Sequence, residues 1–111
     1  MTKEQLRNFR KIKNEQAQIE QRLRNLEKRP ESEEALLLPL KEFYRSKLET
    51  LVAAQLEIER AIETLDYTER ELIRLRYIDG KEWHQVCTGI SYSWQQTHRI
   101  HARILKKLEK L

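Results

Sequence analysis

The amino-acid sequence predicts an all-α protein. Two glycines and two prolines in 111 residues leave few turns to connect its elements. Charged residues make up 36% of the chain and hydrophobic residues 39%, and the hydrophobic residues recur three and four positions apart over long stretches. This pattern is typical of long helices that each bury one apolar stripe. We expect an antiparallel, coiled-coil-like helical hairpin in residues 1–64 and a helix-turn-helix in residues 65–111.

The first long helix is predicted to run from Leu6 to Arg29. Its apolar stripe, with one polar interruption, consists of Phe9, Ile12, Gln16, Ile19, Leu23 and Leu26. Pro30 should end this helix, because its ring disfavours helical backbone angles at the preceding residue. We expect a loop over residues 29–38, in which Leu36 to Leu38 do not remain in water.

The second long helix is predicted from Leu40 to about Leu65, with Pro39 in its first turn, where a missing N–H costs nothing. Two helices of similar length joined by one loop predict an antiparallel hairpin. Each stripe is wider than one partner helix can cover, so either another copy of the hairpin or the C-terminal unit should cover the rest. A homodimer formed through residues 1–64 is the simplest arrangement. The second stripe consists of Leu40, Tyr44, Leu48, Leu51, Gln55, Ile58, Ile62 and Leu65.

Two shorter helices are predicted next. Thr68 and Glu71 have the spacing of a capping box and should start the first of them. Gly80 should end it, because glycine readily takes a positive φ. The apolar positions of this helix are Leu72, Leu75, Tyr77 and Ile78. A short helix from Glu82 to about Gly89 follows, with Trp83, Val86 and Cys87 facing inward.

The last helix is predicted to begin at a second capping box, Ser93 to Gln96, and to run to the C-terminus. Its apolar face consists of Thr97, Ile100, Ile104, Leu108 and Leu111. A short helix, a turn and a longer helix in this order form a helix-turn-helix, whose second helix usually enters the major groove of DNA. Cys87 is expected at the close crossing of the two helices as a small buried residue without a redox role.

The positive charge is concentrated in the same region. Residues 1–66 contain 13 Lys and Arg against 13 Asp and Glu, whereas residues 67–111 contain 9 against 5. The last 45 residues therefore hold the whole net charge of +4. A clustered basic excess is the electrostatic footprint of binding to a phosphate backbone, although a charge of this size also agrees with solubility alone.

The outer faces of the last helix supply the candidate DNA contacts. Glutamine can pair with adenine and arginine with guanine. We predict base contacts by Gln95, Gln96, His98 and Arg99. We predict phosphate contacts by Ser93, Arg103, Lys106 and Lys107. Trp94 has two interpretations: it contacts DNA, or it lies over Tyr92 and the turn.

Other kinds of chemistry find little support in the sequence. His98 and His101 are three apart on one helix, but no Cys or acidic residue joins them at ligand spacing, so we predict no metal site and no cofactor. We find no catalytic triad, glycine-rich phosphate loop or carboxylate pair, and predict that the protein is not an enzyme. The longest near-apolar run, residues 35–40, is far too short to span a membrane. One Cys and a charged N-terminus suit a cytoplasmic protein.

Residues 65–111 resemble region 4 of the bacterial sigma-70 class, and more closely the sigma-region-4-like phage and prophage regulators of the RinA/ArpU type. The resemblance rests on Arg76-Tyr77, Asp79-Gly80, Trp83, Tyr92-Ser93 and His98-Arg99-Ile100-His101. It implies a regulator of phage late genes that binds double-stranded DNA and acts with host RNA polymerase in the cytoplasm of a bacterial host. Cys87, Gly89 and Trp94-Gln95-Gln96 depart from the usual pattern of the group, which leaves the operator sequence open.

Two alternative functions remain open. The first is the small subunit of a phage terminase, which also joins a helix-turn-helix to a helical oligomerisation part and binds DNA at packaging sites. A ring of eight or more subunits would favour the terminase, and a dimer would favour the regulator. The second is a module that binds host RNA polymerase or another host protein, with no specific DNA contact.

Overall fold

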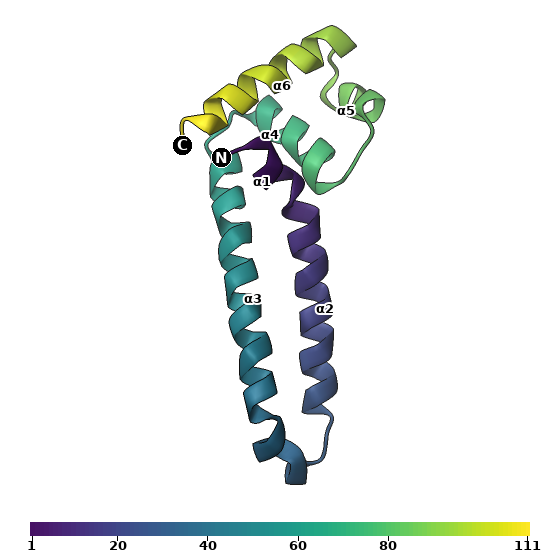
Figure 1. The fold of residues 1–111 in the computed structure, drawn as a ribbon. Helices are drawn as coiled ribbons and strands as arrows, with labels where there is room; N and C mark the ends of the chain where they lie inside the picture. Colours follow the sequence, from purple (N-terminus) through teal and green to yellow (C-terminus); the bar gives the residue numbers. More distant parts are fainter. The chain divides into compact units, whose positions relative to one another are not determined.

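The computed structural model describes residues 1–111 and is helical throughout, with no strand (Figure 1). The prediction of an all-α protein is confirmed. In chain order the elements are α1 (Lys3–Arg7), α2 (Phe9–Glu27), the 3₁₀ helix η1 (Glu31–Glu33), α3 (Glu34–Glu63), α4 (Tyr67–Ile73), the π-helical turn η2 (Arg74–Ile78), α5 (Trp83–Ile90) and α6 (Trp94–Glu109).

The chain forms two compact units. Unit 1 consists of Met1–Arg10 and Glu57–Leu111, and unit 2 consists of Lys11–Leu56. The first ten residues and the end of α3 thus belong to the same unit as the last three helices. The functional division between residues 1–64 and 65–111 stays a prediction.

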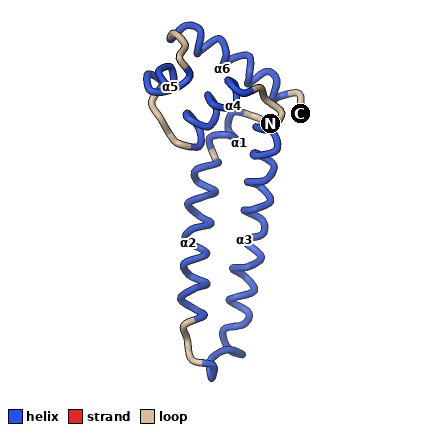
Figure 2. The backbone as a smooth tube through the Cα atoms, turned by 180° about the vertical axis from the view of Figure 1, so that it is seen from behind, coloured by secondary structure: helices blue, strands red, loops and turns tan.

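In unit 2 the segments of α2 and α3 lie side by side and run in opposite directions (Figure 2). The two polar interruptions of the predicted stripes meet here, because the Gln16 side-chain amide donates a hydrogen bond to Oε1 of Gln55 at 2.9 Å. Lys13 donates a second hydrogen bond to Gln16 at 3.3 Å. Gln16 is buried and Gln55 half-buried, and a polar pair of this kind favours one register of two helices over its neighbours.

The loop predicted over residues 29–38 is wrong, because η1 occupies residues 31–33 and α3 begins at Glu34. Pro39 lies in the second turn of α3 rather than in its first. Proline so near a helix N-terminus removes a single backbone hydrogen bond, and the helix formers Ala35 to Leu38 favour the turn before it. The single chain does not bury these leucines: Leu36 is 80% exposed, Leu38 is exposed as well, and Leu37 is half-buried.

The predicted first helix is divided in two. It begins at Lys3, behind a capping box of Thr2 and Gln5, and is interrupted at Asn8 before α2 begins. α2 ends at Glu27, two residues before the predicted end at Arg29 and three residues before Pro30.

Unit 1 contains most of the buried apolar side chains. In it, α4, α5 and α6 pack against one another (Figure 1). The core of this unit consists of Leu6, Phe9, Ile58, Ala61, Ile62, Leu65, Leu72, Ile73, Tyr77, Val86, Ile100, Ile104 and Leu108. Leu75 and Ile78, predicted as core positions, are only half-buried.

The start of α4 differs from the predicted one. Asp66 is the N-cap and accepts a hydrogen bond from the backbone N–H of Glu69 at 2.9 Å, while Glu69 accepts one from the backbone N–H of Asp66 at 3.1 Å. The capping box predicted at Thr68 and Glu71 is therefore wrong. Asp66 to Glu69 has the same spacing two residues earlier, and aspartate caps a helix at least as well as threonine.

The helix that begins as α4 continues directly into the π turn η2 and ends there. The backbone N–H of Asp79 donates to the carbonyl of Arg74, five residues back, at 2.8 Å. Gly80 then takes a φ of +70°, which confirms its predicted role in ending the helix. The π turn was not predicted, because no residue pattern distinguishes it from an ordinary helical turn.

The end of α5 corrects a further expectation. Gly89 lies inside the helix, and Ser91 rather than Gly89 takes the left-handed conformation, with a φ of 62°. A Cβ at Gly89 would come within 2.7 Å of a methyl group of Leu75, so the close contact in this region is made at Gly89. Val86 is fully buried as predicted, whereas Trp83 and Cys87 are only half-buried.

The predicted start of α6 is confirmed. Ser93 is its N-cap and forms a capping box with Gln96. Thr97, Ile100, Ile104 and Leu108 are buried as predicted, but Leu111 lies beyond the helix and is exposed. None of the helices combines the length and the apolar character needed to cross a membrane.

Candidate nucleic-acid interface on helix α6

The outward face of α6 carries a short polar stripe. Gln95, Arg99, Ala102 and Lys106 are four, three and four residues apart, a spacing that places them on one side of a helix. All four are exposed, and they lie opposite the buried positions Thr97, Ile100, Ile104 and Leu108. Arg99 and Lys106 have no carboxylate within 4.0 Å. The stripe therefore presents an amide and two unpaired cations to a ligand.

The side chains of Ser93 and Gln96 form the N-terminal cap of α6. The Ser93 hydroxyl accepts a hydrogen bond from the backbone N–H of Gln96 at 3.2 Å. Oε1 of Gln96 in turn accepts from the backbone N–H of Ser93 at 3.2 Å. These groups satisfy backbone donors at the helix start, so only the Gln96 amide nitrogen remains for a base.

His98 packs between two indole rings. Its ring centroid is 4.5 Å from that of Trp94 and 4.5 Å from that of Trp83. Nε2 of His98 is buried and has no hydrogen-bond partner. Trp94, which is itself exposed, thus covers His98 rather than lying free. The imidazole contributes to packing between α5 and α6, and its predicted contact with a base stays a prediction.

His101 and Tyr77 form a buried polar pair. The Tyr77 hydroxyl lies 2.6 Å from Nε2 of His101. Burial, assisted by the positive charge of Lys3, lowers the pKa of His101 to about 4. Burial also raises the pKa of the Tyr77 phenol. A neutral imidazole that accepts a hydrogen bond from a protonated phenol satisfies both groups.

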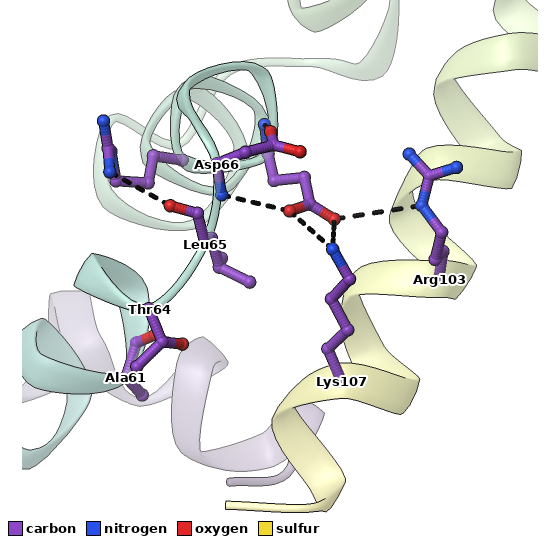
Figure 3. Close-up of polar contacts among 8 residues, drawn as sticks. Ala61, Thr64, Leu65, Asp66, Arg103 and Lys107 are labelled. Atoms are coloured by element: carbon purple, nitrogen blue, oxygen red, sulfur yellow. Dashed lines mark hydrogen bonds and ion pairs between the residues drawn. The ribbon is translucent and has the colours of Figure 1, made fainter.

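Lys107 and Arg103 face a buried carboxylate. Glu69 is 1% exposed, and Nζ of Lys107 lies 2.7 and 2.9 Å from its two oxygens. Arg103 lies 3.9 Å from the same carboxylate, and both cations come from α6 (Figure 3). The pKa of Asp66 is lowered chiefly by the hydrogen bond from the backbone N–H of Glu69, and the charges of the two cations add to this effect. Lys107 thus joins α6 to the start of α4.

Of the eight predicted contact residues, the structure leaves Gln95, Arg99 and Lys106 free of other partners, with Arg103 only loosely paired. Sequence reasoning missed Glu69, although the pattern Asp66-x-x-Glu69 is visible in the sequence. It also missed the pairing of Tyr77 with His101, which are 24 residues apart. Such a pairing leaves no local signal.

No three His, Cys, Asp or Glu side chains come together in an arrangement that could hold a metal ion. Comparison of the chain with protein-family models, with curated proteins and with solved structures gives no match.

Proposed function

We propose that this protein binds double-stranded DNA in a sequence-specific manner and regulates transcription of phage late genes, as a sigma-region-4-like regulator. The observation that carries the proposal is the stripe of Gln95, Arg99 and Lys106 on a capped helix that follows a short helix and a turn. A short bracing helix followed by a longer helix with exposed polar residues near its start suits entry into a major groove.

The surroundings of each side chain indicate whether it can contact a base, contact a phosphate or serve mainly to stabilise the fold. Gln95 and Arg99 are near the start of α6, have free polar groups and are proposed to read bases. Lys106 and Arg103 are farther along the helix and are proposed to contact phosphates. We assign Lys107 mainly to its ion pair with Glu69, and Ser93 and Gln96 mainly to the helix cap.

We further propose that the antiparallel helices α2 and α3 form a homodimer. The outer face of α3 contains a groove of about 520 Å³ lined by Arg45, Leu48, Glu49, Val52, Ala53 and Leu56. Neither Arg45 nor Glu49 has an ion-pair partner. In a two-fold symmetric contact the Arg45 of one copy can meet the Glu49 of the other, which suits a second copy as the occupant.

Selection of bound fragments from phage and bacterial genomes, followed by gel shifts of the selected fragment, tests the proposal. At about 150 mM salt non-specific binding is weakened, and we expect a retained, salt-sensitive complex. Arg99→Ala should weaken binding by about 1–3 kcal/mol and relax the preference at one base pair. Arg24→Ala, a matched loss of an exposed arginine on α2, should bind as the unmodified protein does.

Two results would contradict this assignment. A protein that retards no fragment in a salt-sensitive way does not bind DNA, and a module for binding host proteins would then be favoured. Unchanged affinity and unchanged base preference in Arg99→Ala would exclude Arg99 from base reading, even if the protein binds DNA.

A further inference from the structure

Unit 1 contains a cavity of about 320 Å³ away from the stripe on α6. It lies among α1, the first turn of α2, the π turn and the start of α5. We call it the basic pocket, and its lining consists of Lys3, Arg7, Arg10, Arg76, Tyr77, Gly80 and Trp83. Four of these seven residues are cations, and none carries a carboxylate.

The positive charges of the basic pocket are mostly unpaired. Arg7 has one carboxylate partner, Glu4, at 2.7 Å, but Lys3, Arg10 and Arg76 have none within 4.0 Å. Outside the pocket some arginines, such as Arg29 and Arg74, are paired with carboxylates and others, such as Arg99, are not, so the basic pocket is distinguished by the number of cations that line one cavity. Like charges gathered in a concave surface repel one another, and a bound anion would relieve this repulsion.

Arg76 is held in place, and Arg10 lies close to the backbone of the π turn. Arg76 donates a hydrogen bond to the backbone carbonyl of Lys81 at 2.9 Å, and its guanidinium lies 4.7 Å from the centre of the Trp83 ring. Arg10 lies directly against Gly80, where a Cβ would come within 2.7 Å of the guanidinium carbon. The glycine thus leaves the space that Arg10 fills. A cation that is fixed before a ligand arrives, as Arg76 is, loses less conformational entropy when the ligand binds.

We propose that the basic pocket binds a phosphate group. Guanidinium groups match the geometry of phosphate oxygens, and three arginines and a lysine converge on one cavity. Trp83 already packs against Arg76, His98 and His101, so it offers no free face on which a base could stack. The pocket therefore recognises the phosphate itself, supplied by a small phosphorylated molecule or by a nucleic-acid backbone.

Calorimetric titration with sodium pyrophosphate at matched ionic strength tests the proposal. We expect saturable binding to the unmodified protein and at least about a tenfold weaker binding to Lys3→Gln/Arg10→Gln, since each lost cation removes a charge-assisted contact. Arg24→Gln/Lys28→Gln removes the same charge from exposed positions of α2 and the residue just after it, and should bind as the unmodified protein does. Circular dichroism verifies folding, and Lys3→Gln alone serves if the double variant does not fold, because the Lys3 side chain makes no hydrogen bond.

A second arm identifies the source of the phosphate. If a duplex DNA bound by the protein displaces pyrophosphate from the pocket, the phosphate belongs to a nucleic-acid backbone; if both bind together, it belongs to a free small molecule. Either result supports a phosphate pocket, and the titration does not depend on whether α6 reads DNA. Absence of saturable binding, or equal binding by the pocket variant and the control variant, would overturn the proposal.

Discussion

Lys106 and Lys107 are neighbours in the sequence but have different surroundings. Lys106 lies on the outward stripe of α6 and has no ion-pair partner, whereas Lys107 contacts a carboxylate that is almost completely buried. A charge in water and a charge paired with a buried partner contribute to different properties of the protein. We therefore expect Lys106 to affect DNA binding and Lys107 to affect the stability of the fold.

Replacing each lysine by methionine tests this separation. Lys107→Met leaves the Glu69 carboxylate buried without its main partner and should lower the free energy of unfolding by about 2–3 kcal/mol. Lys106→Met should change stability by less than about 0.5 kcal/mol, yet reduce the salt dependence of DNA binding by about one phosphate contact. Urea unfolding and gel shifts over a salt series measure both. Equal stabilities of the two variants would contradict the assignment of Lys107.

His101 should make the stability depend on pH. Its pKa is about 4 in the folded protein, against 6.5 for a histidine in water, so between these values the unfolded chain binds a proton that the folded chain does not. The contribution of His101 to the free energy of unfolding is therefore present in full above pH 6.5 and is lost as the pH falls toward 4. A shift of this size corresponds to about 3 kcal/mol.

Thermal unfolding between pH 4 and pH 7 measures this effect. The melting temperature should fall with pH in the unmodified protein and fall less steeply in His101→Phe, which keeps a ring beside Trp83 but has no group to protonate. His84→Gln removes an exposed histidine and should keep the slope of the unmodified protein. A slope that His101→Phe does not change would mean that another group titrates.

Among the elements, α4 shows how a short pattern can mislead. Asp66-x-x-Glu69 and Thr68-x-x-Glu71 both have the capping-box spacing, and the sequence alone does not decide between them. In the structure the earlier pair caps the helix, and its glutamate also reaches Lys107 of α6. The glutamate of the capping pair thus also binds a residue that is 38 positions away in the sequence.

The cap is tested by two alanine variants. Asp66→Ala removes the oxygen that accepts from the backbone N–H of Glu69 and should cost about 1 kcal/mol of stability. Thr68→Ala should cost less than about 0.5 kcal/mol, because Thr68 lies inside the first turn and caps nothing. Chemical denaturation of both variants measures the difference. A larger loss of stability in Thr68→Ala than in Asp66→Ala would favour the capping box predicted at Thr68 and Glu71.

The helices with strong periodicity were predictable, and their ends were less so. The buried face of α6 follows from apolar residues spaced three and four apart, and its start follows from a single unambiguous capping box. The start of α3 was predicted too late from Pro39, because proline is tolerated at more than the first position near a helix N-terminus. Of the site, the exposed stripe was predictable, but the packing of His98 between Trp83 and Trp94 depends on how α5 meets α6.

For the whole molecule, the exposed apolar surface of α3 bears on the number of copies. Leu36, Phe43, Val52 and Leu56 are all exposed in the single chain. Such surfaces are typical of helices that meet another chain, and each leucine removed from water contributes about 1.5–3 kcal/mol when fully buried. The proposed homodimer would cover part of this surface through the groove around Val52.

Sedimentation equilibrium with Leu56→Glu tests the dimer. The unmodified protein should sediment as a dimer at micromolar concentration, and Leu56→Glu should shift it toward the monomer because it places a carboxylate in the groove. Gln18→Glu adds the same charge to an exposed position of α2 and should remain a dimer. A monomeric unmodified protein would contradict the dimer, and a ring of eight or more subunits would favour a terminase subunit.

The π turn at Arg74–Ile78 has a consequence for comparing this chain with others. A π turn contains one residue more than an α turn, since Asp79 bonds back across five residues. A protein of the same fold with a regular helix here would be one residue shorter, and its sequence would align with a single gap near Tyr77. Removing one residue from this segment would let the π turn close into an ordinary α-helical turn, and the residues after it would keep their faces.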